Sequence, residues 1–412
     1  MRLSIFRFRL TSLPLTLRLL VTFLFCLQLN SFAQTDQILH SFSGSDGIRP
    51  NGTLVFDASG NLYGTTQSGG STGCGGRGCG TVFELSPESE GTWSYKVIHT
   101  FGGSDGATPM WGVVFDAAGN LYGTTAYGGA NNFGNVFQLQ PTETGWTENV
   151  LYNFTGVDDG GNPFTGVVLD ASGNLYGTTV NGAANKQGTV FELSKSGSSW
   201  SFKVLLDLYN IDGTGPSPLV FDTAGNLYGT AASGGFNRNH MRGTIFELSP
   251  SSGGTWTSSV IFAFTGPETF GENPAGGIVF DKTGNIYGTL ENGGFGDAFG
   301  GSIYELQTPS LEEMDWATFT RFPASPHPPL SPVALDSSNN IYVALSGDGA
   351  SVCYGAILKI GKDVYEIYNF SANSSDGHFP LGGIVLDAQN NVYGATSSGG
   401  GAGYGTIFKV TF

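Results

Sequence analysis

Hydrophobic and polar residues alternate along most of the chain in short runs, which is the period of a half-buried β-strand. Residues 62–66 (Leu-Tyr-Gly-Thr-Thr) and 80–85 (Gly-Thr-Val-Phe-Glu-Leu) are two such runs. The sequence after residue 33 contains no apolar stripe with the 3.6-residue period of a useful helix. The pattern therefore predicts an all-β protein.

One segment, apolar residues followed by Asp-x-x-Gly-Asn-Leu-Tyr, recurs along the chain with minor changes. The Asp carboxylate can accept backbone N–H groups two residues on, and the Gly supplies a positive φ, so the motif predicts a tight hairpin turn. Seven copies of one residue in one chain are better explained as structural than as catalytic. The aspartates are Asp57, Asp116, Asp170, Asp222, Asp281, Asp336 and Asp387.

Seven units of roughly fifty-odd residues, each with four short strands, predict a seven-bladed β-propeller of four-stranded antiparallel blades. A single blade cannot bury both of its faces, so neighbouring blades must stack. A tyrosine recurs at one strand position in every unit and suits this wedge-shaped packing. These residues are Tyr63, Tyr122, Tyr176, Tyr228, Tyr287, Tyr342 and Tyr393.

The two ends of the repeat region predict a closed ring. Residues 38–42 match the fourth strand of a unit, as in residues 97–101, yet they precede the first unit. The last unit reaches residue 412 after its third strand, residues 405–412. We therefore expect the N-terminal strand to complete the last blade and to cover an edge that would otherwise stay open.

Residues 1–33 have the features of a secretory signal peptide: four arginines, no acid, a short apolar stretch and a small-residue pattern ending at Ala33. We expect cleavage there, a propeller domain of residues 34–412, and no membrane span after cleavage. The expected location is secreted or extracytoplasmic, in the periplasm or on the cell surface. How the protein is anchored, if it is, stays open.

Charge narrows the range of partners. The chain has 17 Lys and Arg against 33 Asp and Glu, and loss of the leader with its four arginines changes the net charge from −16 to −20. Such a surface repels nucleic acid and anionic lipid. We expect no nucleic-acid partner, and a monomer.

Departures from the repeat indicate candidate binding residues. Met110, Trp111 and Phe164 follow loop prolines at positions where other units have small or polar residues, so flat rings could stack on a ligand beside the channel mouth. The other tryptophans recur at the start of the outer strand and are interpreted as scaffold. They are Trp93, Trp146, Trp200, Trp256 and Trp316.

Acidic departures gather in the fifth unit. Glu268, Glu272, Glu291 and Asp297 lie in two loops that a propeller places on one face, and their oxygens are the ligands that Ca²⁺ prefers. A solvated acidic rim is the favoured interpretation in a chain this acidic. The aspartates of the loops between blades are each followed by Gly. They are interpreted as turn residues in preference to a cation-binding ring. They are Asp46, Asp105, Asp159, Asp212 and Asp376.

The cysteines and histidines add little chemistry. Cys74 and Cys79 flank a short Gly-rich segment, and export favours their oxidation to a local disulfide over metal binding or redox work. Cys353 is left over and its role stays open. His40 and His99 share one repeated strand position with Tyr152 and are interpreted as packing residues.

The whole unit resembles the tandem repeat of the choice-of-anchor GloVer-containing proteins. The resemblance rests on Phe-x-Gly-x-Asp-Gly-x-x-Pro at residues 101–109, the Asp-x-x-Gly-Asn-Leu-Tyr-Gly-Thr-Thr segment at 116–125, and residues 134–139, and it extends over 38–412. It implies an exported bacterial repeat protein. The Asp-x-x-Gly-Asn-Leu-Tyr hairpin also looks, more distantly, like that of NHL-type and SMP-30-like propellers, which include metal-dependent lactonases and lyases.

Two functions remain. The first is a secreted non-catalytic binding propeller for a glycan, a cell-surface component or another protein. It is favoured because the sequence lacks a His-Glu-x-x-His motif and a phosphate loop. The alternative is a metal-dependent lactonase or lyase that uses the four carboxylates of the fifth unit.

Overall fold

The computed structural model describes residues 35–197, 199–235, 242–265, 271–292, 301–307, 316–321, 328–347, 354–361, 365–373 and 375–412. The expected signal peptide, residues 1–33, and Cys353 lie outside these ranges. The compact unit considered below spans Asp36–Thr411. No helix in the described part of the chain is long and apolar enough to cross a membrane.

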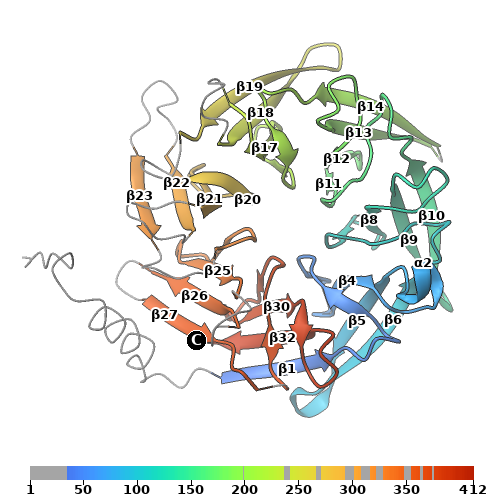
Figure 1. Cartoon of the computed structure of the whole chain (residues 1–412), viewed down its shortest axis with the longest axis vertical. Coiled ribbons are helices and arrows are strands. Elements are labelled where there is room, and N and C mark those ends of the chain that lie inside the picture. The colour runs from blue at the N-terminus through green and yellow to red at the C-terminus, as the bar shows by residue number, and fades with distance from the viewer. Residues whose placement is uncertain are drawn as a thin grey trace, which may run out of the picture. The chain divides into compact units, whose positions relative to one another are not determined.

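Seven antiparallel sheets are arranged as the blades of a β-propeller, which confirms the predicted fold class (Figure 1). The outer strand of each blade leads through a loop, here called the entry loop, to the innermost strand of the next blade.

Blades 1 to 4 follow the chain in order. Blade 1 contains β2 (Ile48–Pro50), β3 (Val55–Phe56), β4 (Leu62–Ser68), β5 (Thr81–Pro87) and β6 (Trp93–Thr100). Blade 2 contains β7 (Val114–Phe115), β8 (Leu121–Thr125), β9 (Asn135–Thr142) and β10 (Gly145–Asn153). Blade 3 contains β11 (Val168–Leu169), β12 (Leu175–Thr179), β13 (Thr189–Ser196) and β14 (Ser199–Asp207). Blade 4 contains β15 (Thr214–Pro216), β16 (Val220–Phe221), β17 (Leu227–Ser233), β18 (Thr244–Ser251) and β19 (Thr255–Ala263).

Blades 5 to 7 complete the ring. Blade 5 contains β20 (Glu272–Phe280), β21 (Ile286–Asn292), β22 (Ser302–Leu306) and β23 (Trp316–Arg321). Blade 6 contains β24 (Ala334–Leu335), β25 (Ile341–Leu345), β26 (Ala356–Ile360) and β27 (Tyr365–Asn369). Blade 7 contains β29 (Val385–Leu386), β30 (Val392–Thr396), β32 (Thr406–Thr411) and the N-terminal β1 (Thr35–Ser41). A short pair, β28 (Gly377–His378) with β31 (Ser398–Gly399), and the single turns α2 (Gly73–Gly76) and η2 (Ser89–Gly91) lie outside the blades.

The closure of the ring is as predicted. β1 pairs with β32, so the sheet order of the last blade is β1-β32-β30-β29. The side chain of Phe42, just after β1, is 1% exposed and packs in a cluster that spans blades 7 and 1. The N-terminal strand therefore supplies both an edge for the sheet and a ring for the core.

The repeated aspartates are turn residues. In blade 2 the Asp116 Oδ1 accepts the backbone N–H of Ala118 and of Asn120, and its Oδ2 accepts the Asn120 amide and the Tyr122 hydroxyl. Gly119 has a φ of 82°, a conformation that suits a residue without a Cβ. One carboxylate thus fixes the hairpin and anchors the buried tyrosine.

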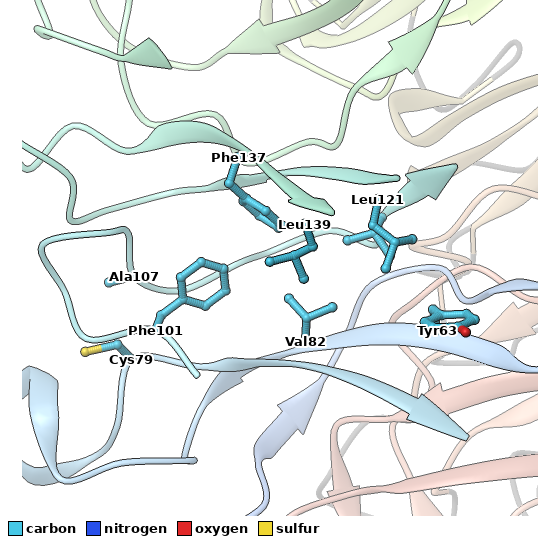
Figure 2. Close-up of a cluster of buried hydrophobic side chains, with 9 residues drawn as sticks. Tyr63, Cys79, Val82, Phe101, Ala107, Leu121, Phe137 and Leu139 are labelled. Atoms are coloured by element: carbon cyan, nitrogen blue, oxygen red, sulfur yellow. The ribbon is translucent and has the colours of Figure 1, made fainter. Parts of the chain in front are cut away.

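The core lies between blades rather than within them. Figure 2 shows one such cluster, in which Tyr63 and Val82 of blade 1 lie beside Leu121, Phe137 and Leu139 of blade 2. Among the described residues, four of these tyrosines also lie against a tryptophan of the next blade's outer strand, as Tyr63 lies against Trp146 with 6.1 Å between ring centroids. The wedge packing inferred from the repeat is thus present, and neighbouring blades are stabilised jointly.

Candidate functional site

One face of the propeller is built from two sets of loops that bond to each other. These are the entry loops and the loops between the second and third strands, and together they are called the loop face. The backbone N–H of Ala107 donates to the carbonyl of Tyr127 at 2.8 Å, and that of Asn162 to Phe133 at 2.7 Å. The loops therefore form one continuous hydrogen-bonded layer and do not project separately from the blades.

Left-handed residues hold this layer together. Thr108, with a φ of 58°, and Asn162, with a φ of 56°, both precede a proline, and each donates its N–H to the loop of the preceding blade. A positive φ is strained for a β-branched residue such as Thr108. Because the same arrangement recurs at Arg49, Asn273 and Phe379, we interpret this strain as part of the blade-to-blade connection.

The exposed apolar side chains gather on the loop face. Among the described residues, every exposed large hydrophobic side chain belongs to an entry loop or to a loop between second and third strands. Five of the six lie in blades 2 to 4 or the loops that join them, and the sixth lies in blade 7. They are Tyr127, Phe133, Val157, Tyr209, Ile211 and Tyr404.

Met110, Trp111 and Phe164 lie at the inner end of this apolar region and are all partly exposed. The Trp111 carbonyl accepts a hydrogen bond from Thr65 Oγ1 of blade 1 at 2.7 Å. Its ring lies against blade 3, because a Cβ built on Gly166 would come within 2.8 Å of the Trp111 Cδ1. Trp111 thus touches both neighbouring blades.

Phe164 reaches back toward blade 2. Its ring centroid lies 5.9 Å from that of Tyr127, which is 43% exposed. Tyr127 was not predicted, although the sequence held a signal: the corresponding residues of blades 1 and 3 are Ser68 and Asn181. Met110, Trp111, Phe164 and Tyr127 together are called the aromatic site.

The acidic residues of blade 5 are only partly described. Glu272 lies on β20 with its carboxylate against the Arg242 guanidinium, and the Glu272 side chain is 15% exposed. Glu291 is exposed on the adjacent strand β21. Glu268 and Asp297 lie outside the described residues. Within the ranges described, no three His, Cys, Asp or Glu side chains are grouped so that they could hold a metal ion.

The aspartates of the entry loops have a partner that the sequence did not reveal. His40 Nε2 lies 3.0 Å from Asp46 Oδ2, His99 Nε2 lies 3.2 Å from Asp105 Oδ2, and the Tyr152 hydroxyl donates to Asp159 at 2.8 Å. Each of these carboxylates also accepts a backbone N–H of its own loop. These contacts support a turn role, and they join two repeated positions that had been interpreted separately.

Burial sets the charge of the two histidines. It lowers the pKa of His40 and of His99, and the hydrogen bond and charge of the paired aspartate only partly offset that decrease. Both imidazoles are therefore neutral at neutral pH, and each can donate its Nε2 proton to the carboxylate.

A polar cavity of about 330 Å³ lies where β1, β27 and the entry loop of blade 7 meet. Asp36, Tyr368 and Asp376 are among its lining residues. Asp376 is 8% exposed, and its carboxylate accepts the backbone N–H of Ser371 and of Gly377. Its oxygens are thus already engaged by the loop.

Cys74 and Cys79 are joined by a disulfide in the loop between β4 and β5. Cys79 is fully buried, and its carbonyl accepts the N–H of Thr108 at 2.7 Å. The bond therefore anchors a loop that itself supports the entry to blade 2.

Comparison with protein families shows to which family the repeat belongs. The model of the Gloeobacter/Verrucomicrobia repeat matches residues 24–170 and 143–326. The chain belongs to this repeat family. No curated protein matches the chain.

Several solved structures are similar to this Gloeobacter/Verrucomicrobia repeat protein at low identity. PorZ, a bacterial surface component of the type-IX secretion system of Porphyromonas gingivalis, is 14% identical with a TM-score of 0.53, over 86% of this chain and 46% of PorZ. A Dyadobacter fermentans protein of unknown function is 12% identical with a TM-score of 0.45, over 91% of this chain and 96% of that one. A gluconolactonase from Xanthomonas campestris is 10% identical with a TM-score of 0.41, over 92% and 89%. At 14% identity the likeness to PorZ concerns the fold alone.

Proposed function

We propose that this protein is an exported, non-catalytic binding propeller that uses its loop face to recognise a glycan, a cell-surface component or another protein. The observation that supports this proposal is the gathering of all exposed large hydrophobic side chains, among the described residues, on that one face. Contiguous exposed apolar groups on a soluble protein are typical of interaction sites.

The composition of the loops supports recognition. Residues 126–134 read Ala-Tyr-Gly-Gly-Ala-Asn-Asn-Phe-Gly, and residues 208–213 read Leu-Tyr-Asn-Ile-Asp-Gly. Tyrosine offers a large rigid surface at low entropic cost, and Asn and Gly supply adaptable hydrogen bonding, as in antibody binding loops. The aromatic site, where Trp111 and Phe164 lie at the junction of blades 2 and 3, is the proposed centre of contact.

Export places the partner outside the cytoplasm. The leader-like residues 1–33 and the acidic mature chain favour a secreted or surface-exposed protein that avoids nucleic acid and anionic lipid. The partner is then a molecule met in the periplasm, at the cell surface or in the medium.

The proposal is tested with residues 34–412 purified, labelled and applied to a glycan array and to an extract of bacterial surface proteins. We expect binding that Tyr127→Ala and Phe164→Ala weaken at least about tenfold, as for residues that dominate an interface. Tyr404→Ala is the matched control, because Tyr404 is a similarly exposed aromatic of the loop face (39%, against 43% for Tyr127) in blade 7.

Three outcomes would count against the proposal. One is the absence of binding to either preparation. Another is binding that the aromatic-site variants leave unchanged. The third is an equal loss in Tyr404→Ala, which would indicate general stickiness instead of a defined site.

A further inference from the structure

Aromatic stacking recurs where the outer strands of neighbouring blades meet. Between blades 7 and 1 the Tyr95 ring stacks on His40, with centroids 3.8 Å apart and planes 5° from parallel. Between blades 2 and 3 the Phe202 ring stacks on Tyr152 at 4.2 Å and 10°. His40 and Tyr152 are the residues that bond the entry-loop aspartates, so each stack covers a hydrogen-bonded pair.

The interface between blades 1 and 2 has a carboxyl group at this stacking position. Glu148 lies opposite Leu139 on β9, as Tyr95 lies opposite Leu85 on β5. The residue that it should cover is His99, whose Nε2 lies 3.2 Å from Asp105 Oδ2. Of these three interfaces, therefore, only this one places a second carboxyl group beside the entry-loop aspartate.

Glu148 is poorly accommodated as an anion. Its Oε1 is buried and has no hydrogen-bond partner among the described residues. Burial, and then the charge of Asp105, raise the pKa of Glu148 to about 7. Asp105 of the entry loop is the charged group that acts on Glu148, and His99 of β6 bonds that same aspartate, while the paired strand β9 contributes the uncharged Leu139.

We propose that Glu148, Asp105 and His99 form a proton-sensitive joint between blades 1 and 2, which is tight while Glu148 holds its proton and loosens when Glu148 ionises beside Asp105. The Glu148 carboxylate then carries a negative charge in a half-buried wedge, and its Oε1 has no hydrogen-bond partner among the described residues. Asp105 also opens the entry loop that continues to Met110 and Trp111, but the joint is independent of the proposed binding function.

The sign of the effect follows from the direction of the shift. A glutamate in the unfolded chain has a pKa of about 4.3. Because the pKa of Glu148 is higher in the folded state, its contribution to stability is fully present below that pH. This contribution is lost as the pH rises toward the folded pKa of about 7. His99 acts in the opposite direction, because its lowered pKa makes the folded state gain stability as the pH rises through the usual histidine range.

The test compares melting temperatures of residues 34–412 from pH 5 to pH 8, for the wild type, Glu148→Gln and Glu148→Phe. We expect the difference between each variant and the wild type to grow in favour of the variant by about 2 °C or more between these limits. Glu148→Phe copies Phe202 and keeps the test valid if the amide variant folds poorly. Glu143→Gln, in the exposed turn after β9, is the control and should follow the wild type at every pH.

A second measurement separates charge from packing. In a pH titration followed by carbon-13 NMR, the Glu148 carboxyl should have its midpoint at about pH 7 in the wild type. The midpoint should be lower in Asp105→Asn, because a neutral neighbour no longer opposes ionisation. The proposal is refuted if the melting temperatures of the wild type and Glu148→Gln change with pH in parallel. It is also refuted if the Glu148 carboxyl titrates with the midpoint of an ordinary glutamate. Neither readout depends on any ligand of the loop face.

Discussion

The backbone N–H of Phe42 donates to the carbonyl of Gly405 at 3.0 Å, so a residue near the start of the folded chain is bonded to one near its end. The bond continues the pairing of β1 with β32. Every blade thus has a neighbour on both sides, and the seven sheets become one cooperative unit.

Loss of the closing strand should destabilise the whole ring. Deletion of residues 34–44 removes β1, exposes the edge of β32 and empties the site of the Phe42 ring. Truncation of a buried phenylalanine alone costs about 3–5 kcal/mol, so we expect Phe42→Ala to lower the unfolding free energy by about that amount and the deletion by more. Chemical denaturation measures both. Unchanged melting of the deletion variant would contradict the closed ring.

A buried hydroxyl in blade 5 should be dispensable. Tyr304 is fully buried with no described partner for its hydroxyl, and the corresponding residues of other blades, such as Phe83 and Phe137, are phenylalanines. We expect Tyr304→Phe to raise the unfolding free energy by about 1–2 kcal/mol, because it removes an unsatisfied polar group. The control is Tyr122→Phe, which should destabilise, since the Tyr122 hydroxyl bonds Asp116 at 3.0 Å. Equal changes in both variants would refute this account.

The sequence predicted what depends on residues close together in the chain. The Asp-x-x-Gly-Asn turn is fixed by contacts within six residues, and the number of units follows from counting it. It did not predict the pairing of His99 with Asp105, because that contact depends on the path of the entry loop. Glu148 was missed for a related reason. Its significance appears only when its register opposite Leu139 is compared with that of Tyr95 in another blade.

The candidate site was predicted less completely than the fold. Trp111 and Phe164 were recognisable as departures from the repeat, but Tyr127 joins them through a contact between two blades. The partner of Glu272 was equally hidden, since Arg242 lies 30 residues earlier in the chain, before the strands β18 and β19 and the entry loop. Spacing along one chain does not determine which loop of the next blade a side chain will meet.

Calcium binding by blade 5, which remains a proposal, should be opposed by Arg242. The guanidinium already neutralises the Glu272 carboxylate that a cation would need. We expect millimolar Ca²⁺ to raise the melting temperature of Arg242→Ala more than that of the wild type, because a ligand that binds only the folded state stabilises it. Arg242→Ala combined with Glu272→Gln is the control and should lose the gain. No Ca²⁺ response in Arg242→Ala would remove Glu272 from any cation site.

Acid should weaken the hairpin turns. Burial raises the pKa of Asp116, but hydrogen bonds from Asn120, Tyr122 and Ala118 more than offset this, so the net pKa is lowered. A lowered folded pKa gives stability that is present above about pH 3.9 and is lost as the pH falls through the folded value. The same direction holds for Asp281, Asp336 and Asp387.

A neutral side chain should remove one part of that acid response. Asp116→Asn replaces one acceptor oxygen by an amide donor, and we expect it to cost about 1 kcal/mol at pH 7 once solvent screening is allowed for. Below the folded pKa the penalty should shrink, because wild-type Asp116 is then neutral as well. Melting from pH 6 to pH 2.5 measures the difference, with Asp158→Asn at an exposed position as the control. A penalty that stays constant down to pH 2.5 would show that the turn depends on the shape of the carboxyl group and not on its charge.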